Sequence, residues 1–490
     1  MKKIIGGIAI LLIALVSVVI WRTVSFKEPV IEPFKDIEFT NSELYKKFQD
    51  ELITKLQKSI TYKTISYQDA SLRDTKEFQR FIEFLKKSFP FVHNNLELKL
   101  INQYTLLYKW QGRNSNLKPV VLMGHYDVVP VSEKEWTVPP FEGKIIDQYM
   151  YGRGTIDDKI TVIGLLQSVE YLLSINHQPE RTIYFSFGHD EEIGGVEGAK
   201  AVVSYLQQNQ IFPEFVMDEG GAITIGMVPG VEKPVATIGI SEKGYVSIKL
   251  IATGRGGHSS TPPEDTAVTR LVRALNKLQE NPFPYGLTDV QRTMFRYVGP
   301  NFPFVQKMAA ANLWLFRPVI ESILKKSDTG RASLHTTMTP TILKAGIKEN
   351  IIPTEAEAVI NLRILPEDSI DGIINRIKKI IQDDNIRIEI LPFSSEPSPV
   401  SAVEGEEGLG FQLIVKTIKT INNDYAIAPY LVLGATDSRY FKEVTKNIYR
   451  FVPMYLNEED MHRMHGNDER ISLESIKTAF QFYAIFIKNL

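Results

Sequence analysis

The stretch Pro119-Val120-Val121-Leu122-Met123-Gly124-His125-Tyr126-Asp127 is a short apolar run that ends in polar residues. An apolar run of this length is typical of a strand that is buried on both faces of a sheet. In open α/β sheets, ligands bind beyond the carboxyl ends of the strands. His125 directly follows the run, and Asp127 points to the same side, where its carboxylate can orient the imidazole. A single histidine in this position is more often structural than a ligand. The residues at the other strand ends are therefore needed to distinguish the two roles.

Two further apolar runs have the same character as the first. They cover residues 182–187 and 214–217, and helical patterns cover residues 160–175 and 198–208 between the runs. Strands that alternate with helices in this way indicate an α/β fold with a mainly parallel sheet that is covered on both faces.

The pattern changes near Tyr245, where apolar and polar residues begin to alternate. The expected elements are then a strand, a helix, two strands, a helix and a strand, at residues 246–250, 267–279, 336–343, 356–363, 370–381 and 386–391. This order is that of the ferredoxin-like split unit. We therefore predict that a catalytic domain, in two parts at 43–244 and 396–490, contains an inserted α+β domain at 245–395.

Residues 283–330 fit neither pattern, because they are rich in Phe, Pro, Met and Leu. One interpretation is a helical insert that packs on its own inserted domain. The other is an apolar wall for a hydrophobic substrate or for a membrane surface.

The N-terminal residues predict a membrane segment at 1–25, followed by a linker at 26–42. The run from Ile4 to Trp21 is uncharged and long enough to span a bilayer, and no small-residue cleavage site follows it. These features favour an uncleaved signal-anchor over a cleaved signal peptide. Lys2 and Lys3 outweigh Arg22, which places the N-terminus in the cytoplasm and the catalytic domain outside it.

The composition excludes several classes of site. The chain has 490 residues, a formal net charge of −2 and no cysteine. Without a basic excess, the chain has no electrostatic footprint for nucleic acid. Without cysteine, it has no disulfide, thiolate nucleophile or thiolate metal ligand, so that a metal site must use His, Asp and Glu.

Three acidic segments are expected at the same sheet edge as His125. They are Gly152-Arg153-Gly154-Thr155-Ile156-Asp157-Asp158-Lys159, Asp190-Glu191-Glu192-Ile193-Gly194-Gly195 and Asp218-Glu219-Gly220-Gly221. The last two directly follow apolar strands. So many carboxylates at one edge are electrostatically costly without a cation. Oxygen and imidazole ligands suit zinc, or its substitutes Mn²⁺ and Co²⁺.

These combined motifs resemble the zinc metallopeptidase and amidohydrolase family of carboxypeptidase S, aminoacylase, carnosinase and the N-fatty-acyl amino acid hydrolase. The resemblance covers nearly everything after residue 43. It is strongest to the carboxypeptidase S and N-acyl amino acid hydrolase branch, because of the length, the N-terminal apolar segment and the apolar insert. It implies two zinc ions per chain, with ligands His125, Asp157, Glu192, Asp218 and His465. Asp157 would bridge both ions, and His462 is a rival for His465.

The resemblance also implies the other site residues. Glu191 would be the general base, Asp127 would orient His125, and His258 would contact the substrate oxyanion, reaching across from a neighbouring subunit. Arg363 would pair with the substrate carboxylate, and Asn350 and the loop that begins at Gly434 resemble substrate-side motifs. The inserted domain would act as a lid and as the surface of a homodimer.

The expected activity is hydrolysis of an amide bond next to an amino acid with a free carboxylate. The substrate would be a small peptide or an N-acyl amino acid. A dipeptidase is an alternative within the class, and an inactive binding protein on the same fold is the alternative outside it. The protein is expected in a membrane with its catalytic domain outside the cytoplasm, or secreted if residues 1–25 are cleaved.

Overall fold

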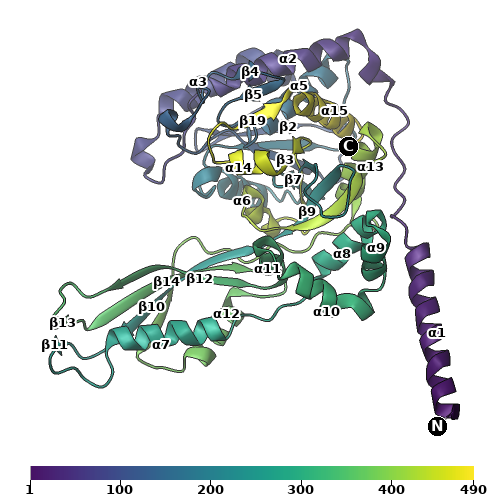
Figure 1. Ribbon diagram of the computed structural model, residues 1–490. Coiled ribbons are helices and arrows are strands. Elements are labelled where there is room, and N and C mark those ends of the chain that lie inside the picture. The colour runs from purple at the N-terminus through teal and green to yellow at the C-terminus, as the bar shows by residue number, and fades with distance from the viewer. Residues whose placement is uncertain (1) are drawn as a thin grey trace.

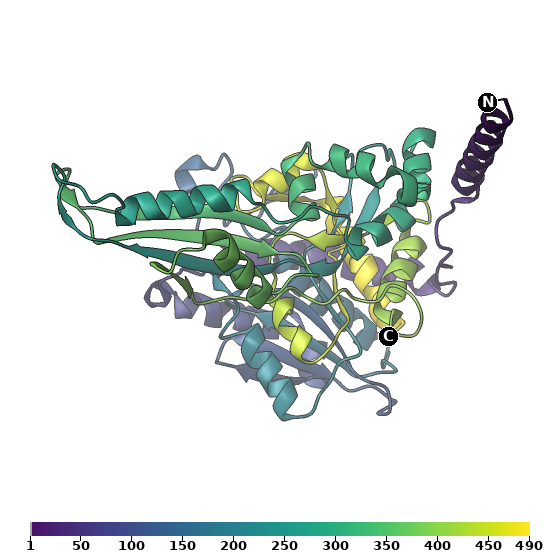
Figure 2. The ribbon, with the colours of Figure 1, turned by 90° about the horizontal axis from the view of Figure 1, so that it is seen from below.

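The computed structural model describes residues 2–490, which are organised around two separate sheets (Figure 1). The larger sheet lies in the body that contains the C-terminus, and the smaller sheet projects from this body. Turned by 90°, the projection is an elongated arm (Figure 2). The apolar helix α1 (Lys2–Ser25) stands apart from both.

The larger sheet has the strand order β1-β2-β6-β3-β7-β17-β9-β8-β18, with β16 paired to β9. Its central pairs β6–β3, β3–β7 and β7–β17 are parallel, which confirms the predicted mainly parallel α/β sheet. The strands are β1 (Glu97–Ile101), β2 (Thr105–Trp110), β3 (Val120–His125), β6 (Ile183–Gly188), β7 (Val216–Asp218), β8 (Ile223–Thr224), β9 (Val235–Glu242), β16 (Ala426–Val432), β17 (Ile448–Arg450) and β18 (Tyr455–Leu456). A separate three-stranded sheet contains β4 (Lys144–Ile146), β5 (Tyr149–Tyr151) and β19 (Arg470–Ser472).

Both faces of the larger sheet are buried. Along β3, Leu122 packs in the core that contains α5 and α15, whereas Val121 and Met123 pack in a second core that contains α6. Alternate residues of a strand point to opposite faces, so the continuous apolar run reflects helices on each side. The covering helices are α2 (Glu43–Ile60), α3 (Thr75–Ser88), α4 (Pro90–Asn95), α5 (Lys159–Ser174), α6 (Ala199–Gln208), α13 (Leu409–Ile421), α14 (Glu458–Arg463) and α15 (Leu473–Lys488).

The smaller sheet has the order β12-β14-β10-β15 and is antiparallel, which is the strand order of the ferredoxin-like split unit. Val246, Ile248 and Leu250 of β10 face the helices of this unit, and the residues between them face outward. The elements are β10 (Gly244–Thr253), α7 (Ala267–Glu280), β12 (Thr337–Ala345), β14 (Glu355–Ile364), α12 (Ile370–Ile381) and β15 (Ile386–Ile390), with β11 (Gly257–His258) and β13 (Ile351–Ile352) at the far end. The domain boundaries and the roles as lid and dimer surface stay predictions.

The segment 283–330 is helical, but most of it does not pack on the inserted domain. It forms α8 (Asp289–Val298), α9 (Phe304–Ala311), α10 (Leu313–Leu324) and α11 (Asp328–Leu334). Val298 packs with Val235 and Ala428 of the larger sheet, and Tyr297 contacts Phe411 edge to face. The first interpretation, that this segment is core for the inserted domain, is therefore wrong about its neighbour. Periodicity predicts a helix with one apolar face, but it does not say which domain that face covers.

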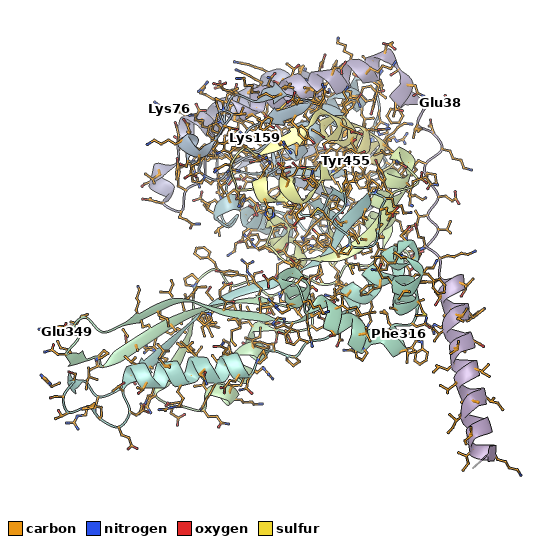
Figure 3. All side chains as sticks on the ribbon, in the orientation of Figure 1. Glu38, Lys76, Lys159, Phe316, Glu349 and Tyr455 are labelled. Atoms are coloured by element: carbon orange, nitrogen blue, oxygen red, sulfur yellow. The ribbon has the colours of Figure 1, made fainter. Side chains whose placement is uncertain are left out.

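Helix α1 is long and apolar enough to cross a membrane, with a mean hydropathy of 2.9, and only 6% of that window is buried. Its side chains project mostly into open space (Figure 3). A signal sequence passes the same test of length and composition. Short 3-10 turns complete the chain at η1 (Glu38–Asn41), η2 (Ala70–Leu72), η3 (Glu133–Glu135), η4 (Glu191–Ile193), η5 (Gly299–Asn301) and η6 (Asp437–Glu443).

Candidate metal centre

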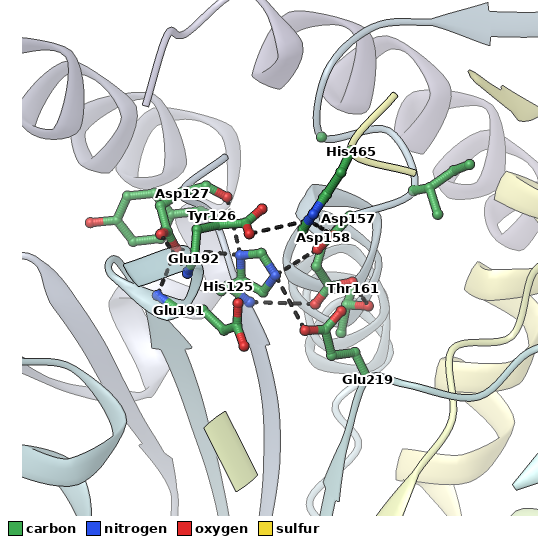
Figure 4. Close-up of polar contacts among 12 residues, drawn as sticks. His125, Tyr126, Asp127, Asp157, Asp158, Thr161, Glu191, Glu192, Glu219 and His465 are labelled. Atoms are coloured by element: carbon green, nitrogen blue, oxygen red, sulfur yellow. Dashed lines mark hydrogen bonds and ion pairs between the residues drawn. The ribbon is translucent and has the colours of Figure 1, made fainter. Parts of the chain in front are cut away.

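Histidine and carboxylate side chains from five separate segments meet at one edge of the larger sheet (Figure 4). Strands β6, β3 and β7 are adjacent and parallel, so their carboxyl ends lie at the same edge. His125 is the last residue of β3, Glu192 lies in η4 after β6, and Glu219 directly follows β7. Asp157 comes from the turn before α5, and His465 from the loop before β19. Segments far apart in the sequence are thus brought together by the sheet topology.

The Asp157 carboxylate lies between two imidazoles. Its Oδ1 is 2.8 Å from His125 Nε2, and its Oδ2 is 2.9 Å from His465 Nε2. Each imidazole has a second carboxylate beside it. His125 Nε2 is 3.3 Å from Glu219 Oε1, and His465 Nε2 is 3.2 Å from Glu192 Oε2. The result is two similar groups of one histidine and one glutamate, which share one aspartate.

Burial and mutual charge shift the pKa values of several side chains in this cluster. Hydrogen bonds to Asp157 and Glu192 raise the pKa of His465 to about 10. Burial, followed by the charge of Asp157, raises the pKa of Glu192 to about 7 and that of Glu219 to about 7. Burial opposes ionisation of Asp157, yet the hydrogen bonds with His125 and His465 outweigh it and hold its pKa below the usual range. A divalent cation would remove the repulsion among these carboxylates.

The donors fit a metal. Glu192 Oε1 is buried and has no hydrogen-bond partner within the described residues, although a buried carboxylate oxygen normally has one. His125 Nδ1 is 3.1 Å from the Asp127 carbonyl oxygen and 3.3 Å from its Oδ1, which leaves Nε2 to face the cluster. This is the arrangement in which a second partner fixes the tautomer of a ligating histidine.

The predicted ligand Asp218 and its neighbour Glu219 make different contacts, and the role of Asp218 as a ligand stays a prediction. The carboxylate beside His125 belongs to Glu219, whereas Asp218 Oδ2 accepts the backbone N–H of Ser438 at 2.9 Å. Asp218 is still part of β7, and side chains alternate across a strand, so neighbouring residues point in opposite directions. His462 is exposed on α14, whereas His465 Nε2 lies 2.9 Å from Asp157 and 3.2 Å from Glu192, so that His465 is the histidine of this region that contacts the cluster.

Glu191 lies beside the cluster without bridging the two imidazoles. Its backbone N–H and that of Glu192 donate to the two carboxylate oxygens of Asp127, each at 3.2 Å. Burial raises the pKa of the Glu191 carboxyl well above its usual range; His125 opposes this shift and Glu219 adds to it. Asp127 therefore connects the His125 imidazole to the turn that carries Glu191.

Glu469 was not predicted, although it fixes two segments of the site. Its carboxylate is fully buried and pairs with Arg153 at 2.6 Å, and it accepts the backbone N–H groups of Gly154 and Ile156. These contacts join the turn that carries Asp157 to the loop that carries His465. The signal in the sequence is the arginine of the glycine-rich turn, because a buried guanidinium requires an acidic partner.

The His465 side is open to solvent. The His465 side chain is 53% exposed, whereas that of His125 is 2% exposed. A substrate can therefore approach the cluster from the His465 side without rearrangement of the sheet.

Arg363 lies at the end of the inserted sheet that is nearest to the catalytic domain. It stacks on Tyr245 at 4.8 Å and is paired with it across β14 and β10. Burial lowers the pKa of Arg363, and the nearby charge of Arg439 acts in the same direction. Gly434 is exposed at the start of the loop that carries Arg439. Glu242 Oε2 holds this loop by accepting the N–H of Thr436 at 3.1 Å.

His258 and Asn350 lie at the opposite end of the inserted domain, where the backbone carbonyl of Asn350 accepts the N–H of Ser259 at 3.1 Å. Figure 3 labels the neighbouring Glu349 at this tip. Strand β10 has 10 residues and spans about 30 Å from Gly244 towards this tip. His258 and Asn350 therefore lie apart from the metal cluster of their own chain, and the contact of His258 with the site of a neighbouring subunit stays a prediction.

Comparisons with known proteins agree with this architecture. The sequence profile described as peptidase family M20/M25/M40 matches residues 121–489. A probable carboxypeptidase S-like 2 from Dictyostelium discoideum is 41% identical, over 98% of this chain and 92% of that protein. The N-fatty-acyl-amino acid synthase/hydrolase PM20D1 from Xenopus tropicalis is 38% identical, over 98% of this chain and 93% of that protein.

Solved structures share the fold at low sequence identity. The M20 family metallo-carboxypeptidase Sso-CP2 from Sulfolobus solfataricus has a TM-score of 0.64 and 18% identity, and the match covers 90% of this chain and 98% of the other. The YXEP protein from Bacillus subtilis, described as a dinuclear metal-binding peptidase of the M20 family, has a TM-score of 0.56 and 14% identity, with coverage of 90% and 98%. The chain therefore belongs to peptidase family M20/M25/M40 and is a hydrolase of that family.

Proposed function

We propose that this hydrolase cleaves the amide bond between an acyl or peptidyl group and an amino acid with a free carboxylate, and that it uses two divalent metal ions. The observation that carries the proposal is the Asp157 carboxylate between His125 and His465, each with a further glutamate beside it. One aspartate shared between two pairs of histidine and glutamate suits a pair of ions.

We assign one ion to His125 and Glu219, the other to His465 and Glu192, and Asp157 to both. Imidazole and carboxylate donors without thiolate suit Zn²⁺, with Mn²⁺ or Co²⁺ as substitutes. When bound, the two ions would lower the pKa of a water molecule and polarise the scissile carbonyl.

Glu191 is the proton carrier in this proposal. Its carboxyl group lies beside the cluster, and Asp127 holds its backbone N–H. A carboxylate in this place takes a proton from the attacking water and delivers it to the nitrogen of the leaving amine. The buried surroundings of Glu191 favour the protonated form, which the second of these transfers requires.

Arg363 is the proposed partner of the substrate carboxylate. A guanidinium group binds a carboxylate with two parallel hydrogen bonds, and the stacking on Tyr245 holds its plane in one orientation. The Gly434 loop, which carries Arg439 near Arg363, is the other proposed substrate-side segment. One relative is named as a carboxypeptidase and the other as an N-fatty-acyl-amino acid hydrolase. Both names describe a reaction that releases an amino acid with a free carboxylate.

Arg363→Lys is expected to reduce kcat/KM for an N-acyl amino acid by about 10- to 100-fold, because a point charge replaces a two-pronged hydrogen bond worth about 1.5–3 kcal/mol. The wild type should be comparably poor on the amide of the same substrate. Steady-state kinetics on the acid and the amide test both statements. Arg387→Lys, on β15 of the same sheet, is the control and should leave kcat/KM unchanged. Equal wild-type rates on acid and amide would contradict recognition of the carboxylate and indicate a general amidase.

The acyl side is proposed to be hydrophobic. For a series from N-acetyl to long-chain N-acyl versions of one amino acid, kcat/KM should rise with chain length. Each buried methylene contributes about 0.8 kcal/mol, which corresponds to an increase in kcat/KM of at most about fourfold for each added CH₂. A flat series would contradict a hydrophobic acyl site and favour a short-chain aminoacylase, and preference for unblocked dipeptides would favour a dipeptidase.

His258 and Asn350 are proposed to serve the site of a second copy of the chain, since β10, which spans about 30 Å, separates them from the catalytic domain of their own chain. The inserted domain would then be both a lid and the surface of a homodimer. Helix α1 is proposed to anchor the chain in a membrane, with the catalytic domain outside the cytoplasm, or to direct secretion if it is cleaved.

A further inference from the structure

Helices α9 and α10 expose an apolar surface, which we name the α9–α10 face. On α10, Leu315, Val319 and Ile323 recur every four residues, which places them on one side of the helix. Ile320 lies on the other side and is buried in a small core with Leu334. The members of the α9–α10 face are Phe304, Val305, Trp314, Leu315, Val319 and Ile323, and Val305 is 70% exposed.

The α9–α10 face lies next to the end of α1. The side chain of Asn312, between α9 and α10, donates to the Val19 carbonyl and to Thr23 Oγ1, each at 3.3 Å. Arg22 Nε donates to the Ala311 carbonyl at 3.3 Å. The last turns of α1 are therefore attached to the junction of α9 and α10, while the rest of α1 extends away from the protein (Figures 1 and 2).

A cavity of about 550 Å³ lies at this junction, and we name it the arginine pocket. It is lined by Arg22, Arg292 and Arg296, and by apolar residues that include Phe26 and Trp314. Arg292 pairs with Asp289, and Arg296 is 3.0 Å from Glu404, but neither acidic residue lines the pocket. The pocket thus combines positive charge with an apolar wall, and Trp314 belongs to both the pocket and the α9–α10 face.

We propose that the α9–α10 face is a membrane-docking surface and that the arginine pocket holds the headgroup of an anionic phospholipid. Where α1 leaves the bilayer, the face that is attached to it must meet the interfacial region. Tryptophan and apolar side chains are favourable at that depth, and arginine side chains bind anionic lipid headgroups there. This inference rests on α1 spanning the membrane, as proposed above. Docking would fix the orientation of the catalytic domain relative to the bilayer.

The absence of cysteine allows the test on the full-length chain. Single cysteines are introduced as Val305→Cys, Ile323→Cys, Leu12→Cys in α1 and Ile347→Cys, and each is labelled with an environment-sensitive fluorophore. Ile347 is a matched control, because it is an apolar residue that is 94% exposed at the far end of the inserted domain. The four proteins are compared in detergent and in vesicles of phosphatidylcholine and phosphatidylglycerol.

On transfer to vesicles, the labels at positions 305 and 323 should shift to shorter emission wavelength and be quenched by nitroxide-labelled lipid, and the label at 347 should do neither. A response at position 12 alone would keep the anchor and overturn the docking surface. No response at position 12 would overturn the anchor, and the docking surface with it. A response at 305 that depends on protein concentration and not on lipid would overturn the proposal in favour of contact with a second copy.

The headgroup site is tested with Arg292→Gln combined with Arg296→Gln. The control is Arg331→Gln on α11, because Arg331 and Arg292 are equally exposed and each pairs with an aspartate three residues before it. The chain is extracted from mixed vesicles, and the retained phospholipid is measured by mass spectrometry. The wild type and the control should retain phosphatidylglycerol in excess over phosphatidylcholine, and the double variant should lose this excess. Equal retention by all three proteins would overturn the headgroup site.

Discussion

Glu191→Gln is expected to lower kcat by about 10²- to 10⁴-fold while the bound metal is retained. Glutamine has nearly the shape of glutamate, so the backbone N–H groups that Asp127 accepts can stay in place. It cannot take or deliver a proton at its side chain, and the chemical step therefore loses its proton carrier. The measurements are steady-state kcat on an N-acyl amino acid and elemental analysis of the purified variant.

Glu197→Gln is the control for this prediction, because it makes the same change in the same loop. Glu197 is exposed, its carboxylate contacts Arg73 at 2.9 Å, and it makes no contact with His125, His465 or Asp157 among the described residues. It should leave kcat unchanged. Near-normal turnover of Glu191→Gln would move the general base elsewhere, and loss of metal from it would mean that Glu191 and Glu192 have exchanged roles.

The fold could be predicted where the pattern of apolar residues reflects which faces of a strand are buried. The runs at 119–124 and 182–187 are largely apolar on both sides of the strand because helices cover both faces of β3 and β6. The alternation along 246–250 reflects a sheet with helices on one face only. The partner of α8 could not be predicted, because its apolar face would fit either domain equally well and the choice depends on tertiary packing.

The candidate site could be predicted where it depends on topology. His125 and Glu192 follow adjacent parallel strands, so that the rule for ligands at the carboxyl ends of strands brings them together. Topology within one chain does not place His258 and Asn350, because the length of β10 separates them from this edge and their predicted roles depend on a second subunit. The partner of Arg153 was missed because Glu469 is more than 300 residues away in the sequence and no local pattern connects them.

The sequence pattern does not say which of the adjacent residues Asp218 and Glu219 points towards His125. Both follow an apolar run, and a shift of one residue at the end of a strand reverses which of them points towards His125. Only the position at which β7 ends distinguishes them. In the structure Glu219 contacts His125, and Asp218 accepts the N–H of Ser438. This difference leads to the second prediction of large effect.

Glu219→Gln is expected to weaken the binding of one ion, because it removes a charged donor that we assign to that ion. Loss of a residue that only supports a ligand lowers metal affinity by about 10- to 100-fold, and the loss here should be larger. kcat/KM at limiting metal should fall with it. Asp218→Asn is the matched control: its amide oxygen can still accept the Ser438 N–H, so that both ions and the activity should be retained. Metal content after dialysis, measured with activity across a metal titration, separates the two variants. The reverse result, with metal lost from Asp218→Asn and kept by Glu219→Gln, would contradict the assignment of Glu219 and make Asp218 the ligand beside His125.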